Sequence, residues 1–200
     1  MQRILSVVLL VAACNLTTHA QLSNVPVTGF NSDQVAEGVG VPTASSTSAT
    51  DGGVDNGGYV FIDGTYQYNA TCALPGANFL PANRQIASTA AAGLVYNLQL
   101  YNSFNALRVP ATGVTTGSGK LFFTTPTAAA TVYLLSVSGG GAIASGINVT
   151  IKFTDSTSQV FNSQSTQDWC NTTSGGNYTK ITTTQYNRIQ ATTTTGCANF

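Results

Sequence analysis

Charge is scarce in this chain, since only 7% of its 200 residues are Asp, Glu, Lys or Arg, against about a quarter in ordinary globular domains. The seven basic and seven acidic residues give a formal net charge of zero. Proteins that bind nucleic acids or anionic lipids do so through an excess of Lys and Arg, and this chain has none. We therefore predict no nucleic-acid partner.

Histidine is almost absent. The single one, His19, lies in an N-terminal segment that we expect to be removed. The remaining chain then lacks the imidazole of a Ser-His-Asp or Cys-His pair and of a His-ligated zinc or copper site. General acid–base chemistry would fall to carboxylates, most of which stand beside Gly, Asn or Ser, as turn residues do. We predict that the chain is not an enzyme, although two facing carboxylates remain a third hypothesis.

Residues 1–20 have the pattern of a secretory signal peptide. Arg3 supplies the positive charge, residues 4–13 are apolar, and Thr18-His19-Ala20 is a small-residue cleavage site. The apolar run is too short to span a bilayer, so we predict no membrane span and a secreted or cell-surface protein. As an alternative, residues 11–14 resemble a lipoprotein box, which would leave Cys14 as a lipidated N-terminus.

Alternation of apolar and polar residues is the main structural signal. It is clearest over residues 147–163, where two alternating runs flank Asp155-Ser156 and predict a β-hairpin with one buried face. Similar runs cover residues 59–62, 66–70 and 94–101, and residues 132–137 are apolar on both faces, as in a central strand. No helical period is found. The pattern predicts an all-β chain that forms an antiparallel β-sandwich, jelly-roll-like, over residues 21–200, with a flexible loop at 42–58.

Several short motifs recur in secreted proteins. They lie at Val25–Asp33, Asn105–Pro110, Thr131–Val137 with the glycines that follow, Val149–Asp155 and Asp168–Cys170. With these motifs the chain resembles secreted β-sandwich modules of Bacteroidetes, which are associated with type IX secretion. The resemblance implies an extracellular module joined to other domains of a longer chain, and it carries no catalytic residues. Since the sequence stops at Phe200 as if inside a strand, we interpret it as incomplete at its C-terminal end.

Residues 51–58 and Asp63 combine hard oxygen ligands with glycine. Calcium takes six to eight oxygens, so a structural Ca²⁺ could be held by Asp51, Asp55, Asn56 and Asp63. The spacing differs from that of an EF-hand loop, and ordinary turns have the same composition. No other cofactor is expected.

Three cysteines remain after the signal segment, an odd number. We predict a disulfide between Cys170 and Cys197, which would leave Cys72 free or paired in missing sequence. Cys72 with Cys170 is the alternative.

Aromatic side chains could bind a sugar by stacking. Tyr66 and Tyr68 share a strand face, and Tyr59, Tyr101 and Trp169 lie near loops. We take Tyr66, Tyr68 and Trp169 as candidate ligand-binding residues, although most aromatics in β-sandwiches are core residues. Two functions therefore stand beside the enzyme hypothesis: a non-catalytic extracellular or cell-surface module for adhesion or structural spacing, and a carbohydrate-binding module attached to a secreted hydrolase. The binding partner of the protein would be a polysaccharide or a cell-surface glycan.

Overall fold

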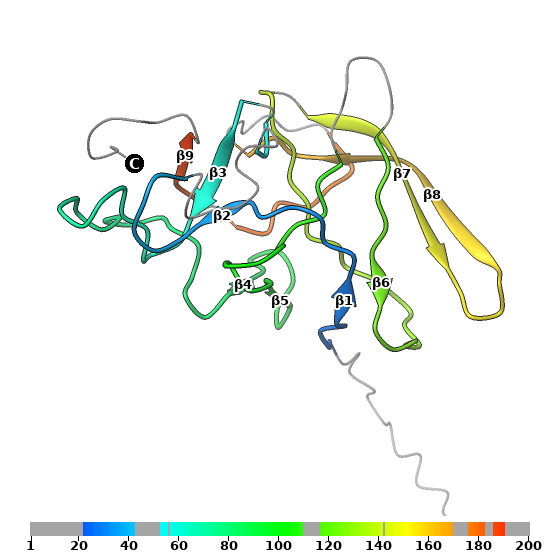
Figure 1. Ribbon diagram of the computed structural model, residues 1–200. Helices are drawn as coiled ribbons and strands as arrows, with labels where there is room; N and C mark the ends of the chain where they lie inside the picture. Colours follow the sequence, from blue (N-terminus) through cyan, green and yellow to red (C-terminus); the bar gives the residue numbers. More distant parts are fainter. Residues whose placement is uncertain are drawn as a thin grey trace, which may run out of the picture.

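The structure is a computed structural model that describes residues 22–42, 53–55, 57–109, 117–141, 143–169, 176–182 and 186–190. Its elements are short β-strands joined by long irregular segments (Figure 1). The all-β prediction is therefore confirmed. The predicted signal segment and most of the 42–58 loop lie outside the described residues.

In the described part of the chain, the strands form four separate sheets of two or three strands each. Most are only two to four residues long, and β7 and β8 have nine each. In chain order the strands are β1 (Val27–Thr28), β2 (Val35–Ala36), β3 (Tyr59–Ile62), β4 (Gln85–Ala87), β5 (Val95–Asn97), β6 (Phe122–Phe123), β7 (Ala144–Lys152), β8 (Ser158–Thr166) and β9 (Arg188–Gln190).

The three-stranded sheet, β2-β3-β9, holds the best-buried part of the molecule. Its central strand β3 pairs in parallel with β2 and antiparallel with β9. Because side chains alternate across a strand, Val60 and Ile62 share one face with Ile189 of β9. That face is the core, which contains Ala36, Val60, Ile62, Tyr66 and Ile189, with Phe79 packed against it.

A second core cluster lies beside the first. Val35 of β2 packs there with Leu80, Ile86 and Tyr101, and the Tyr101 hydroxyl donates a hydrogen bond of 2.8 Å to the Pro81 carbonyl. The antiparallel pair β4-β5 brings Ile86 opposite Tyr96. The partly buried side chains packed against this second cluster are Phe61, Leu98, Ile181 and Tyr186.

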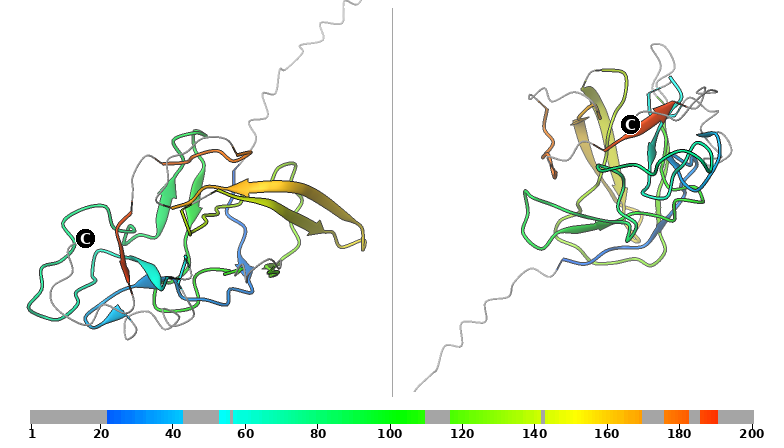
Figure 2. Two further views of the ribbon diagram at one scale, coloured as in Figure 1. Left: turned by 90° about the horizontal axis from the view of Figure 1, so that it is seen from above. Right: turned by 90° about the vertical axis from the view of Figure 1, so that its left-hand side faces the viewer.

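The predicted hairpin at 147–163 is present as β7 and β8 (Figure 1). Asp155 forms its turn as predicted, because its Oδ1 accepts hydrogen bonds from the Thr157 amide at 2.9 Å and the Thr157 hydroxyl at 2.6 Å. These bonds lower the pKa of the Asp155 carboxyl. The prediction of a buried face is wrong for most of the hairpin, which extends away from the other strands (Figure 2).

Among the described residues, a closed β-sandwich or jelly-roll is not seen. The four sheets do not merge into two facing layers, and the β2-β3 pairing is parallel rather than antiparallel. Residues 132–137, predicted as a central strand, form no strand and are exposed. The predicted strand at 66–70 is replaced by turns with an isolated bridge between Gln67 and Val39. Within the described residues, no helix has the length and apolar character that crossing a membrane requires.

Candidate functional site

An arginine and three aromatic rings meet on the face of the β2-β3-β9 sheet opposite to Val60 and Ile62. The guanidinium carbon of Arg188 lies 4.7 Å from the centre of the Tyr59 ring and 4.8 Å from the nearer ring of Trp169. Trp169 also stands edge-on to Phe61, with ring centres 5.1 Å apart and an interplanar angle of 88°. We call Tyr59, Phe61, Trp169 and Arg188 the ring–arginine cluster.

Strand alternation explains how three members of the ring–arginine cluster come together. Tyr59 and Phe61 are two residues apart on β3, so both side chains point away from the core that holds Val60. Arg188 of β9 is the direct cross-strand partner of Phe61. Cross-strand pairs place side chains about 5 Å apart on one face of a sheet. Trp169, which follows β8, contacts them on that face.

Two turns fix the surroundings of the ring–arginine cluster. The Asp55 carboxylate accepts backbone hydrogen bonds from Gly57 at 2.8 Å and Tyr59 at 3.3 Å, which shape the turn into β3. Trp169 is held by its amide, which donates to the Ser138 carbonyl at 2.9 Å. The glycine turn after Ser138 packs tightly on the Asp55 turn, since a Cβ at Gly139 would lie 2.6 Å from the Asp55 Cα.

The structure separates the predicted sugar-binding residues. Tyr66 is fully buried in the core and Tyr68 is only 9% exposed, so neither ring is available to stack on a sugar. The alternation of apolar and polar residues at 66–68 therefore reflects burial of the two tyrosines and not a row of exposed rings. Trp169 is partly exposed and belongs to the ring–arginine cluster. Arg188 is not among the residues predicted from the sequence, although its position opposite Phe61 is a signal that strand pairing would have given.

The predicted calcium ligands do not converge in the described part of the chain. Asp55 precedes β3 and Asp63 follows it, so the strand places them on the order of 13 Å apart. Asp63 serves a turn, with its Oδ1 accepting bonds from the Thr65 amide at 2.8 Å and hydroxyl at 2.7 Å. Asp51 and Asn56 lie outside the described residues. Among the residues that are described, no group of three His, Cys, Asp or Glu side chains is arranged to hold a metal.

Three carboxyl groups influence one another beside the core. Burial, together with the negative charges of Asp33 and Asp63, raises the pKa of Glu37 to about 8. Asp33 is 1% exposed, and its Oδ1 accepts a hydrogen bond of 2.6 Å from the side-chain Nδ2 of Asn105. The Asn105 side-chain oxygen in turn accepts from the Gln34 amide at 2.9 Å. Asp33 thus holds Asn105 beside β2, which is a structural role.

Cys72 is buried and takes part in a disulfide. The alternative in which its thiol is free is therefore wrong. Cys14, Cys170 and Cys197 lie outside the described residues, so the pairing of Cys170 with Cys197 stays a prediction.

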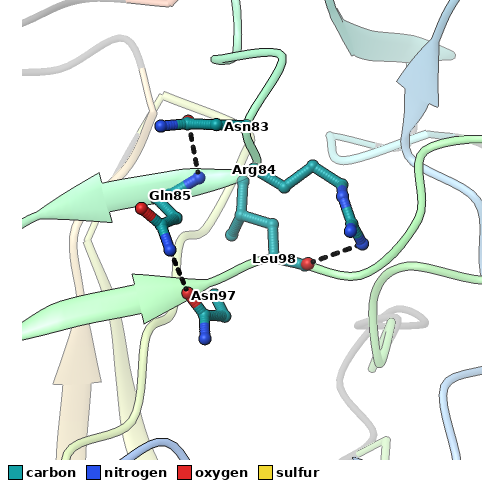
Figure 3. A pocket seen from close by; sticks show the side chains of 5 residues that line it. All are labelled: Asn83, Arg84, Gln85, Asn97 and Leu98. Carbon is teal, nitrogen blue, oxygen red and sulfur yellow. Dashed lines mark hydrogen bonds between the residues drawn. The ribbon is translucent and has the colours of Figure 1, made fainter.

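A pocket lies at the edge of the β4-β5 pair, away from the residues predicted from the sequence (Figure 3). Its polar side chains are engaged with one another or with the backbone. Gln85 Nε2 donates to Asn97 Oδ1 at 3.2 Å, and the Gln85 amide donates to Asn83 Oδ1 at 3.1 Å. It contains no carboxylate, and its lining residues are Asn83, Arg84, Gln85, Asn97 and Leu98.

No family model, curated protein or solved structure matches the chain. The resemblance to secreted modules of Bacteroidetes stays a prediction.

Proposed function

We propose that the chain is a non-catalytic extracellular or cell-surface module for adhesion or structural spacing. The observation that carries this proposal is the exposed apolar surface of residues 121–167, which we call the low-charge segment. Its only charged residues are Lys152 and Asp155. Its exposed large apolar side chains are Phe122, Phe123, Val132, Tyr133, Leu134, Leu135, Val137, Ile147, Phe153, Val160 and Phe161.

An exposed surface of this kind favours contact with another protein surface. Contiguous apolar patches are rare on monomeric proteins and typically mark interaction sites. A two-stranded hairpin is marginally stable in water, so β7 and β8 gain stability when a partner covers them. The zero net charge of the chain removes the electrostatic repulsion that would oppose such contacts.

The test is association of the purified chain, measured by sedimentation velocity over a range of concentrations. We expect the wild type to associate and the double variant F153S/F161S to associate at least tenfold more weakly. A tenfold change corresponds to about 1.4 kcal/mol in the free energy of association. The control is Phe104→Ser, because Phe104 is 56% exposed but lies outside the low-charge segment. A fully monomeric wild type, or equal association of all three proteins, contradicts the proposal.

Carbohydrate binding is the second candidate, and the ring–arginine cluster favours it. Trp169 and Tyr59 are partly exposed rings on one face, and aromatic rings are suited to the apolar faces of sugars. Retention on immobilised polysaccharides in affinity electrophoresis tests this function. Loss of retention in Trp169→Ala, with a preserved fold, is the expected result.

A further inference from the structure

The outer edge of β8 is open over residues 158–162, which we call the open edge. β8 pairs with β7 alone, and no other strand in the described part of the chain adjoins it (Figure 1). Further along β8, Asn177 occupies the backbone. The Ser165 amide donates a hydrogen bond of 2.7 Å to Asn177 Oδ1, and Asn177 Nδ2 donates one of 3.3 Å to the Ser163 carbonyl. The open edge is therefore the half of β8 next to the hairpin turn.

The hydrogen-bond pattern of the hairpin decides which backbone groups of β8 point outward. The Phe153 amide donates a hydrogen bond of 2.9 Å to the Thr157 carbonyl, so these two residues form a hydrogen-bonded pair. Hydrogen-bonded and non-hydrogen-bonded pairs alternate along an antiparallel ladder. By this alternation the pair of Thr150 with Val160 is non-hydrogen-bonded. The amide and carbonyl of Val160 therefore point away from β7, toward a strand that would lie beside β8.

The open edge lacks the features that ordinarily protect an edge strand. Natural sheet edges carry charged residues, proline or bulges, which prevent pairing with other chains. Residues 158–162 contain no charged residue and no proline. The strand on the other side of the hairpin differs, because β7 carries Lys152 and has register shifts between Ala144 and Val149. Of the two edges, the open edge of β8 is thus the better suited to accept a further strand.

The open edge is complementary to a second copy of itself. In an antiparallel pairing centred on Val160, this residue lies opposite Val160 of the second copy, and Ser158 lies opposite Asn162. Apolar thus faces apolar and polar faces polar. The outward amide and carbonyl of Val160 meet the same groups of the second copy, as a hydrogen-bonded pair requires. The net charge of zero means that the two copies do not repel each other.

Pairing with a second copy also supplies what the hairpin lacks. A two-stranded hairpin is marginally stable, whereas three or more strands with an apolar face can be stable. Val149 is the cross-strand partner of Phe161, and Ile151 lies two residues along β7, so all three share one face. Phe161 is 37% exposed. In a sheet of four strands, this face of one copy continues into that of the other.

We propose that two copies of the chain associate through the open edges of their β8 strands, which pair antiparallel about Val160 and form a four-stranded sheet. This inference rests on the proposed function, in which the low-charge segment contacts another protein surface. It names the partner, a second copy, and the mode of contact, which is backbone pairing at a strand edge.

Proline substitution separates edge pairing from contact through the apolar face. Val160→Pro removes the outward amide of the open edge and leaves the hydrogen bonds to β7 in place. Thr150→Pro is the matched control, because Thr150 is the cross-strand partner of Val160 and its amide points outward from the opposite edge. In sedimentation velocity, we expect Val160→Pro to associate at least about tenfold more weakly than the wild type and Thr150→Pro to associate like it. Circular dichroism confirms that each variant is folded.

Charge exchange at Val160 tests the register and decides the question if a proline variant does not fold. Val160→Lys and Val160→Glu each place like charges opposite one another, so each alone should associate at least about tenfold more weakly than the wild type. An equimolar mixture of the two should associate more tightly than either alone, because Lys then lies opposite Glu. The same substitutions at Thr150 are the control, and mixing them should change nothing.

The contrary outcomes are distinct. Wild-type association of Val160→Pro and Val160→Lys, with weakened association of F153S/F161S, overturns edge pairing and leaves the proposed function in place. Equal losses in Val160→Pro and Thr150→Pro overturn the assignment to the β8 edge. A mixture of Val160→Lys and Val160→Glu that associates no better than its components overturns the pairing about Val160. A wild type that is monomeric at every concentration contradicts both this inference and the proposed function.

Discussion

The β2-β3-β9 sheet and the β7-β8 hairpin have the same sequence pattern and opposite environments. On β3, Val60 and Ile62 are fully buried, whereas on the hairpin Ile147 is 37% and Val160 50% exposed. Alternation shows which face of a strand is apolar, but it does not show whether another part of the chain covers that face. In this molecule the cover comes from loops such as the one that carries Tyr66, whereas most side chains of β7 and β8 stay exposed. This difference motivates the proposed role of the low-charge segment as a contact surface.

The sharpest contrast between the two regions is the cost of removing an apolar side chain. We expect Ile62→Ala to lower the free energy of unfolding by about 3 kcal/mol, because it leaves a cavity in the core. Ile147→Ala should cost less than about 1 kcal/mol in dilute solution, since its side chain is already half hydrated. Urea denaturation measures both values, and equal costs would remove the distinction.

The disulfide of Cys72 should stabilise the buried region strongly. Cys72→Ser is expected to cost about 2–4 kcal/mol, because the cross-link restricts the unfolded chain. Thermal unfolding of this variant gives the cost. Peptide mapping of the unreduced wild type identifies the partner, and recovery of Cys72 as a free thiol would contradict the structure.

Close packing of two turns supports the ring–arginine cluster. Gly139→Ala should cost about 1–3 kcal/mol, since its Cβ would overlap the Asp55 Cα and lie 2.7 Å from the Val54 carbonyl oxygen. It should also shift the emission of Trp169, whose amide donates a hydrogen bond to the carbonyl of Ser138, next to Gly139. The neighbouring Gly140 has open space around a Cβ but a φ of +99°, so Gly140→Ala isolates backbone strain from overlap. A Gly139→Ala variant with unchanged stability and unchanged Trp169 emission would contradict the close packing.

The smallest expected effect concerns pH. The folded chain keeps a proton on Glu37, whose pKa is about 8, whereas the unfolded chain releases it near 4.5. The stability linked to this proton is therefore complete below pH 4.5 and is lost as the pH rises through about 8. We expect a decrease of about 1–2 kcal/mol between pH 5 and pH 8, allowing for solvent screening.

Glu37→Gln should flatten that dependence. Asp155→Asn is the matched control, because the pKa of Asp155 is lowered and its carboxyl titrates below this range. Denaturation at both pH values provides the measurement, and a slope that survives in Glu37→Gln would assign it to another group.

Local features of the fold could be predicted, and long-range ones could not. Strand β3 and the hairpin with Asp155 at its turn follow from alternation and turn chemistry, which act within a few residues. Two features depend on contacts between distant segments, which cannot be read from a single sequence. They are the parallel β2-β3 pairing and the exposure of residues 132–137. For the same reason Trp169 was recognised as a candidate while its neighbour Arg188, 19 positions further along, was not.

Native-state hydrogen exchange tests the contrast between the two regions most directly. Amides of β3 and β9 should exchange only by global unfolding, and those of β7 and β8 should exchange orders of magnitude faster in dilute solution. Raising the protein concentration should then slow the exchange of the hairpin and leave β3 unchanged. A hairpin that is as well protected as β3 at every concentration would contradict the account.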